Sequence, residues 1–326
     1  MKFGRRIAHF LLMIIILAIV LVGTMQSVLF IYFSKHGPLV EQKTMVIHPG
    51  MSLMNIGQEL SDAGIIRHPL LFDAAVKTLR GSHLIKAGEY AFTPGMTPRQ
   101  IADMMIAGKA IIHRLTIPEG TTTREILKMI SQETALTGPM PEGIREGDLL
   151  PETYFFSYGD QRQQLVERMR SRMKHILQPL WQNRADNLPF TTPAEAVVLA
   201  SIVEKETGID KERPHVAAIF INRLRKGMKL QSDPTVIYSL TLGQKELGRM
   251  LTHDDLRIIS PFNTYVIDGL PPLPIDNPGK ASIEAVLNPI DSDDLYFVAD
   301  GKGGHNFAAT LAQHNRNVQK YRDNLR

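Results

Sequence analysis

The stretch TPAEAVVLASIVEKETG, residues 192–208, predicts the helix around which the C-terminal half of this chain is organised. Thr192 is a strong N-cap residue, Pro193 suits the first helical position, and Glu195 completes a capping box. Residues 196–203 are apolar on nearly every face of that helix, which is typical of a buried helix. The sequence therefore predicts a helix that passes through the core of a domain.

Two glutamates stand at the C-terminal end of this helix, before Gly208, which we expect to end it. Glu204 and Glu206 are two residues apart, about 200° around a helix, so they cannot share a face. Steps of three and four residues from Val203 and Ile202 reach Glu206. We therefore expect Glu206 to point inward and Glu204 to be solvated or paired. On periodicity alone, the alternative is that both simply lie on the surface of a fraying helix end.

A carboxyl group delivered by the end of a buried helix is expected to have a raised pKa. Desolvation disfavours the anion, and the negative pole of the helix acts in the same direction. Such an acid stays protonated near neutral pH and can donate a proton to a leaving group. Glu206 is the candidate for this role.

The segments downstream carry polar and aromatic side chains in short loops. Residues 230–238 are interpreted as a polar turn between apolar segments, and residues 260–265 and 269–274 as rigid loops. A Gly-rich loop at 300–307 follows a predicted strand at 295–299. These loops are rich in side chains that hydrogen-bond to and stack on sugars, although a structural contact is the alternative for each residue. The expected cleft lining is Gln231, Asp233, Tyr238, Asn263, Tyr265 and His305.

Several classes of site are disfavoured by composition and spacing. The chain has no cysteine, which excludes disulfides and Cys nucleophiles. The Gly-rich loop lacks the P-loop pattern, and the histidines 253, 305 and 314 have no metal-ligand spacing. We therefore expect no metal and no organic cofactor. The formal net charge of +4, from 37 Lys and Arg against 33 Asp and Glu, is too small to indicate nucleic acid.

The N-terminal segment, residues 7–33, contains no Asp, Glu, Lys or Arg and is long enough to cross a bilayer as a helix. We expect an uncleaved anchor rather than a signal peptide, because an aromatic cluster follows in place of a small-residue cleavage site. The cluster is Phe30, Tyr32 and Phe33, and the cations ahead of the segment are Lys2, Arg5 and Arg6. The positive-inside rule then keeps residues 1–6 in the cytoplasm and sends the rest outward. ATP, NAD and nucleic acid become disfavoured as substrates, and cell-envelope polymers favoured.

The chain of 326 residues is accordingly predicted to consist of an N-terminal transmembrane helix followed by an α+β protein. A linker is expected at 34–44, a small α+β module at 45–110, and a larger α+β domain at 111–326.

Six segments together resemble one known family in their order and sequence. They are ASIVEKET (200–207), FINRL (220–224), QSDPTVIY (231–238), NTY (263–265), GLPP (269–272) and YFVADGKGGHNF (296–307). The chain closely resembles the endolytic murein transglycosylase family, also called MltG or YceG-like. The resemblance covers the chain from about residue 45 to the C-terminus and is weaker toward residue 45.

The resemblance implies a single-pass enzyme of the cell inner membrane, with a cytoplasmic N-terminus and a periplasmic catalytic part. It implies a LysM-like module at 45–110 and a catalytic domain at 111–326 that cuts MurNAc–GlcNAc β-1,4 bonds in nascent peptidoglycan strands. Such cleavage leaves 1,6-anhydro-MurNAc ends and limits strand length. The family's catalytic glutamate is the second of its Glu-Lys-Glu block, here Glu206, which acts as general acid and then as base. The family's link to peptidoglycan synthases implies partners in elongation or division.

The sequence departs from the family pattern in two places. The segment LPETY, residues 150–154, has Glu152 where the family commonly has Asp, and residues 241–259 match poorly, so no residue is transferred from them. Two other functions stay open. One is a lysozyme-type hydrolase in which Asp233 or Glu152 positions water. The other is a non-catalytic, membrane-anchored peptidoglycan-binding scaffold, which has no need of a glutamate at the end of a buried helix.

Overall fold

The computed structural model describes residues 2–79 and 85–324. Met1, at the start of the expected cytoplasmic segment 1–6, and residues 325–326, at the end of the expected catalytic domain, lie outside this range. The chain is a mixed α+β protein with an apolar N-terminal helix. It divides into two compact units, residues 1–113 with 156–159, and residues 114–155 with 160–326.

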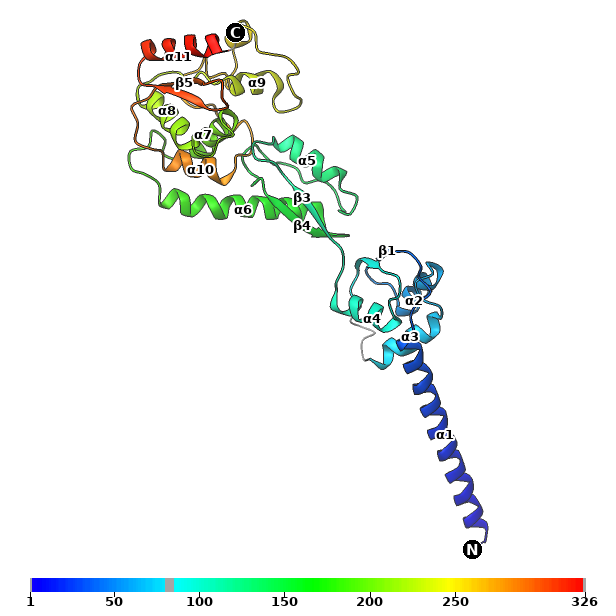
Figure 1. The fold of residues 1–326 in the computed structure, drawn as a ribbon. Helices are drawn as coiled ribbons and strands as arrows, with labels where there is room; N and C mark the ends of the chain where they lie inside the picture. Colours follow the sequence, from blue (N-terminus) through cyan, green and yellow to red (C-terminus); the bar gives the residue numbers. More distant parts are fainter. Residues whose placement is uncertain (1, 80–84, 325–326) are drawn as a thin grey trace. The chain divides into compact units, whose positions relative to one another are not determined.

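The first unit combines the apolar helix with a small α+β core (Figure 1). Its elements are α1 (Lys2–Ser34), β1 (Lys43–Ile47), α2 (Leu53–Asp62), α3 (Pro69–Thr78), β2 (Gly88–Phe92) and α4 (Pro98–Ala107). The strands are antiparallel, with Lys43 opposite Phe92 and Ile47 opposite Gly88. Within α1, residues 9–34 have a mean hydropathy of 2.6, so this helix is long and apolar enough to cross a membrane. β1 begins inside the segment that was expected to be a linker, residues 34–44.

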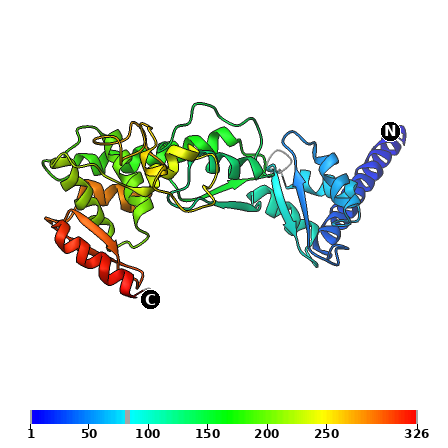
Figure 2. The ribbon, with the colours of Figure 1, turned by 90° about the horizontal axis from the view of Figure 1, so that it is seen from above.

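A two-stranded sheet, β3 (Ile112–Thr116) and β4 (Thr153–Ser157), follows in the element order with α5 (Thr123–Gln132) between its strands. The elements after β4 belong to the second unit. They are α6 (Arg162–Gln182), α7 (Pro193–Glu206), α8 (Arg213–Arg225), α9 (Asp233–Thr241), the 3₁₀ turn η1 (Asp255–Arg257), α10 (Lys280–Leu287), β5 (Tyr296–Ala299), β6 (His305–Ala308) and α11 (Leu311–Asn324). β5 and β6 form an antiparallel hairpin, and α11 packs along it (Figure 2).

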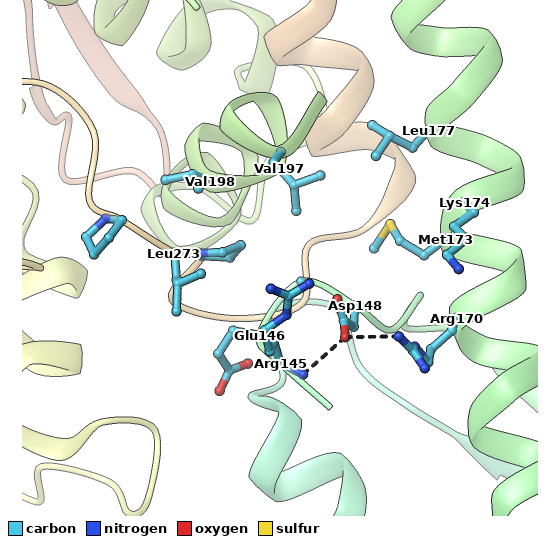
Figure 3. Close-up of a pocket in the computed structure, with 14 residues that line it drawn as sticks. Arg145, Glu146, Asp148, Arg170, Met173, Lys174, Leu177, Val197, Val198 and Leu273 are labelled. Carbon is cyan, nitrogen blue, oxygen red and sulfur yellow. Dashed lines mark hydrogen bonds and ion pairs between the residues drawn. The ribbon is translucent and has the colours of Figure 1, made fainter. Parts of the chain in front are cut away.

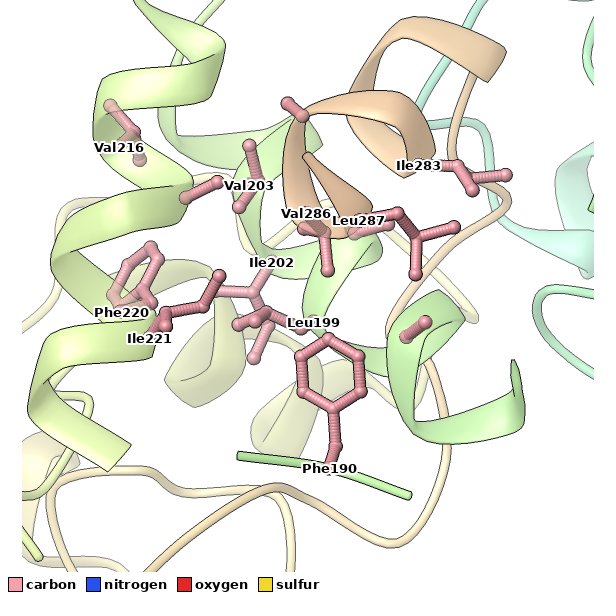
Figure 4. Close-up of a cluster of buried hydrophobic side chains, with 14 of the residues drawn as sticks. Phe190, Leu199, Ile202, Val203, Val216, Phe220, Ile221, Ile283, Val286 and Leu287 are labelled. Carbon is pink, nitrogen blue, oxygen red and sulfur yellow. The ribbon is translucent and has the colours of Figure 1, made fainter. Parts of the chain in front are cut away.

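α7 is the central helix of the second unit, packed against α6, α8, α9 and α10. Its residues Leu199, Ile202 and Val203 are fully buried among side chains of α8 and α10, as Figure 4 shows. Burying an aliphatic side chain of this size stabilises the fold by about 1.5–3 kcal/mol. The predicted buried helix is thus confirmed, and the core holds its C-terminal end in place.

Candidate active site

The two ends of α7 follow different rules from each other. The predicted capping box is present at the start: the Thr192 hydroxyl accepts a hydrogen bond from the Glu195 amide, and the Glu195 carboxylate accepts one from the Thr192 amide. At the other end, α7 stops at Glu206, so the expected end of the helix just before Gly208 is confirmed. Thr207 is the C-cap, in an extended conformation with φ of −144°, so the end needs no left-handed glycine.

Glu204 and Glu206 point to different surroundings, as their spacing requires. Glu204 is 5% exposed and accepts from the Arg213 guanidinium at 3.1 Å and from the Gly279 amide at 2.9 Å. Glu206 is half-buried, and its Oε1 accepts from the Ser232 hydroxyl at 2.5 Å. Glu204 is therefore paired, which is one of the two outcomes expected from the sequence, but its side chain is also buried. Both of its oxygens are occupied by structural partners.

Glu206 lies in a pocket of about 390 Å³ within the second unit. The walls come from the end of α7, from α8, from the start of α9, from the loop after η1, from β5 and from α11. The lining residues are Glu206, Arg223, Leu230, Gln231, Asp233, Tyr265, Tyr296, Phe297, Leu311 and His314. The pocket thus joins an acid to aromatic and polar side chains in a hollow, which suits a ligand with apolar faces and hydroxyl groups.

The pKa of Glu206 is raised to about 7, chiefly because burial disfavours its anion. The hydrogen bond from Ser232 lowers this pKa, the nearby carboxylate of Asp233 raises it, and electrostatic interactions with His305 and Arg223 lower it. A carboxyl group with a pKa near the working pH can give up a proton and take it back. Glu206 therefore has the electrostatic properties of a general acid and base.

Hydrogen bonds to the backbone and between side chains fix the pocket walls. Arg223 is 8% exposed and donates to the carbonyls of Leu295 and Leu230, both at 2.7 Å. The Tyr265 hydroxyl donates to Asp233 Oδ1 at 2.6 Å. Burial, followed by this carboxylate, raises the pKa of Tyr265, so the phenol stays protonated and keeps its hydrogen to donate.

Three of the six expected lining residues share the pocket with Glu206: Gln231, Asp233 and Tyr265. Gln231 has a φ of 52°, a left-handed backbone that is uncommon for a residue other than glycine. Strained backbone of this kind concentrates at functional sites. The segment 230–238, interpreted from sequence as a turn, instead begins α9 at Asp233, with Pro234 in its first turn. That prediction of a turn was wrong, and the helix start is what holds Asp233 at the pocket.

The other three expected residues lie outside this lining. Asn263 is fully buried and donates to the carbonyls of Leu256 and Ile258, while its own oxygen accepts from the Tyr265 amide. Asn263 thereby shapes the loop that carries Tyr265. Tyr238 packs its ring against Phe262, with ring centroids 4.9 Å apart, and lines a neighbouring pocket.

His305 contacts the residue that precedes α8. Its Nδ1 lies 2.6 Å from a carboxylate oxygen of Glu212, which precedes α8, and its amide donates to the other oxygen at 3.1 Å. Its effect on Glu206 is electrostatic and lowers the pKa of that carboxyl.

Sequence reasoning missed several residues that line or support the pocket: Ser232, Arg223, Tyr296 and His314. Ser232 sits between Gln231 and Asp233, and only the fold reveals that its hydroxyl faces Glu206. Arg223 had a readable signal, because it lies three and four residues after Phe220 and Ile219 on the buried face of α8. A cation on such a face needs a partner or a function.

Two further features bear on where chemistry can occur. Glu152 forms an ion pair with Arg172 at 2.8 Å and does not line the Glu206 pocket. Across the described residues, no group of three or more His, Cys, Asp or Glu side chains could hold a metal ion.

A second pocket of about 260 Å³ lies along the first half of α7 (Figure 3). Its apolar wall includes Val197 and Val198. Among its charged lining residues, Asp148 forms an ion pair with Arg170 at 3.8 Å. None of the residues expected to line the cleft takes part in it. The candidate active site is therefore the pocket at Glu206.

Comparisons of this chain with known protein families and with known sequences agree with each other. The model of the YceG-like family matches residues 45–320. The endolytic murein transglycosylase of Bacillus subtilis (strain 168) is 30% identical over 316 residues, covering 86% of each chain. The protein of that name from Streptococcus pneumoniae serotype 2 (strain D39 / NCTC 7466) is also 30% identical, over 327 residues and 85% of this chain. This chain spans 58% of the length of that relative.

Among solved structures, the crystal structure of a YceG-like protein from Listeria monocytogenes is similar. It has a TM-score of 0.52 and 31% sequence identity, and the match covers 85% of this chain and 98% of that one.

Proposed function

Because this chain belongs to the YceG-like family, we propose that it is an endolytic murein transglycosylase in which Glu206 is both general acid and general base. One observation carries the proposal: Glu206 is a carboxyl group whose pKa is raised to about 7, held by Ser232 in a pocket of sugar-binding composition. Peptidoglycan glycan strands are the proposed substrate.

In the proposed reaction, protonated Glu206 gives its proton to the oxygen of the MurNAc–GlcNAc β-1,4 bond as the bond from that oxygen to the MurNAc anomeric carbon breaks. The C6 hydroxyl of the same MurNAc then bonds to the anomeric carbon and gives its proton to the Glu206 carboxylate. The products are a GlcNAc hydroxyl and a 1,6-anhydro-MurNAc end, and the acid is regenerated without water. The substrate's N-acetyl group stabilises the intermediate, so that no carboxylate nucleophile is needed.

A hydrolase of the lysozyme type is the second candidate, because Asp233 lines the same pocket and could position water. Cleavage in heavy-oxygen water separates the two. We expect released MurNAc ends that are one water lighter than hydrolysed ends and that carry no heavy oxygen, as read by mass spectrometry. Incorporation of heavy oxygen at the MurNAc anomeric carbon would assign the hydrolase.

Glycan cleavage is expected to fall as the pH rises through about 7. The first step needs the protonated acid, and the protonated fraction of Glu206 decreases above its pKa. Two neighbouring variants should move this limb of the profile in opposite directions. Ser232→Ala removes a bond that favours the anion and moves the limb to higher pH; Asp233→Asn removes a charge that disfavours the anion and moves it to lower pH. A limb that both variants leave in place contradicts the assignment.

In this proposal, α1 anchors the enzyme in the cell inner membrane, with Lys2, Arg5 and Arg6 on the cytoplasmic side and the two units in the periplasm. Residues 45–110 are proposed to bind glycan as a LysM-like module. The order β1, α2, α3, β2, with the strands antiparallel, supports that role. Peptidoglycan synthases of elongation or division are the proposed protein partners.

A further inference from the structure

A pocket of about 270 Å³ lies within the first unit, where α1 ends beside the start of α3. Its lining combines apolar, aromatic and basic side chains. The residues are Val28, Ile31, Tyr32, Lys35, His36, Gly37, Arg67, His68 and Pro98. It is far in sequence from the residues of the active site and has no part in the proposed reaction.

The end of α1 is built into the core of its unit, so that the walls of this pocket hold their places relative to the helix. Leu29 and Phe33 are 7% and 8% exposed and pack in the hydrophobic core below α3 and α4. The Tyr32 hydroxyl donates to the His68 carbonyl at 3.1 Å, and the Gly37 amide donates to the Met96 carbonyl at 2.9 Å. The pocket is therefore a fixed feature of the place where α1 joins the rest of the first unit.

The charge of the pocket is positive and not neutralised by the protein. Within the described part of the chain, the side chains of Lys35 and Arg67 have no hydrogen bond or ion pair. No acidic residue is among the described residues that line the pocket. An anion that enters would meet two cations without displacing an internal partner.

The opposite wall is apolar and continuous with the face that α1 offers to lipid. Val28 and Ile31 are about half exposed, at 48% and 51%. As a helix, the 26 residues 9–34 measure about 39 Å, which is more than the hydrocarbon core of about 30 Å. The last turns of α1, and with them Lys35 and Arg67, therefore lie at the level of the headgroups. The pocket thus presents cations at headgroup depth and apolar side chains one and two helical turns closer to the hydrocarbon core.

We propose that this pocket binds the phosphate of an anionic glycerophospholipid, with the acyl chains of that lipid lying against Val28 and Ile31. Lys35 and Arg67 hold the phosphate. The inference rests on the anchoring of α1 in the proposed function, and not on the reaction at Glu206. The bound lipid would fix the module at the membrane surface.

The test uses the full chain in phosphatidylcholine nanodiscs, with a trace of spin-labelled phosphatidylglycerol or spin-labelled phosphatidylcholine. Electron paramagnetic resonance measures the immobilised fraction of each lipid. We expect a larger immobilised fraction for phosphatidylglycerol than for phosphatidylcholine. The double variant Lys35→Gln with Arg67→Gln should abolish this preference, and each cation should contribute about fivefold to it. The matched control, Arg99→Gln with Lys109→Gln, removes two exposed cations from the same unit and should keep the preference.

Equal retention of the two lipids by the unaltered chain would overturn the proposed site. The proposal would also be overturned if the control variant lost the preference for phosphatidylglycerol as fully as the double variant does. Displacement of phosphatidylglycerol by inorganic phosphate would assign a free anion in place of the lipid and overturn the proposal. Absence of any immobilised lipid would show that α1 is not in the bilayer, and the anchoring would fall with the site. The lipid readout does not depend on glycan cleavage, so a failure of the transglycosylase assignment leaves it unchanged.

Discussion

Glu206→Gln is expected to lower kcat for glycan cleavage by about 10²–10⁴-fold, the usual contribution of a general acid and base. Glutamine has the shape and neutrality of the protonated acid, and its amide oxygen can still accept from the Ser232 hydroxyl, but it cannot transfer a proton. The fold and substrate binding should therefore be retained. Kinetics on purified glycan strands, with thermal unfolding measured alongside, test this expectation.

Glu204→Gln is the matched control, since it makes the same change two residues earlier on α7. Glu204 does not line the pocket, and its oxygens are held by Arg213 and the Gly279 amide. We expect this variant to unfold at a lower temperature while retaining most of the kcat per folded molecule. A comparable loss of kcat in both variants would indicate that the integrity of the helix end, rather than proton transfer by Glu206, supports activity.

Arg213→Ala is expected to destabilise the second unit by about 3–5 kcal/mol. The Arg213 side chain is 7% exposed and contacts Glu204, Glu119 and Asp210 at 3.1, 3.3 and 2.5 Å. Its removal leaves Glu204 buried with only the Gly279 amide as a donor. The carboxylates gathered around the former cation then repel one another, and the pKa of Glu119, already raised by burial and by Glu204, should rise further.

Guanidinium unfolding followed by tryptophan fluorescence measures this effect. The chain has a single tryptophan, Trp181, whose ring lies 6.4 Å from that of Phe190 in the second unit, so the signal reports that unit. Lys280→Ala removes an exposed ion pair with Glu284 on α10 and should cost less than about 1 kcal/mol. Equal midpoint shifts in the two variants would contradict the structural role assigned to Arg213.

The part of the site that lies on one helix could be predicted from sequence. The capping box at Thr192, the apolar run 196–203 and the different surroundings of Glu204 and Glu206 all follow from local spacing on α7. Each of these rests on interactions between residues a few positions apart, which the order of residues shows directly.

The remainder of the site depends on contacts between distant segments. Ser232 reaches Glu206 across 26 positions and Tyr265 reaches Asp233 across 32, and no local pattern encodes either pair. The segment 230–238 was interpreted as a turn because its polar residues outweighed the helix-start signal of Pro234. The end of α7 before Gly208 agrees with the sequence, but the cap is the extended residue Thr207 and not a left-handed glycine.

Mass spectrometry of the fragments that the full chain releases from purified peptidoglycan sacculi, beside those from its Glu206→Gln variant, tests the central claim most directly. The account predicts 1,6-anhydro-MurNAc ends from the unaltered chain and about 100-fold fewer of them, or less, from the variant. Free reducing MurNAc ends, equal release by both proteins, or sacculi that both bind and leave intact would contradict it.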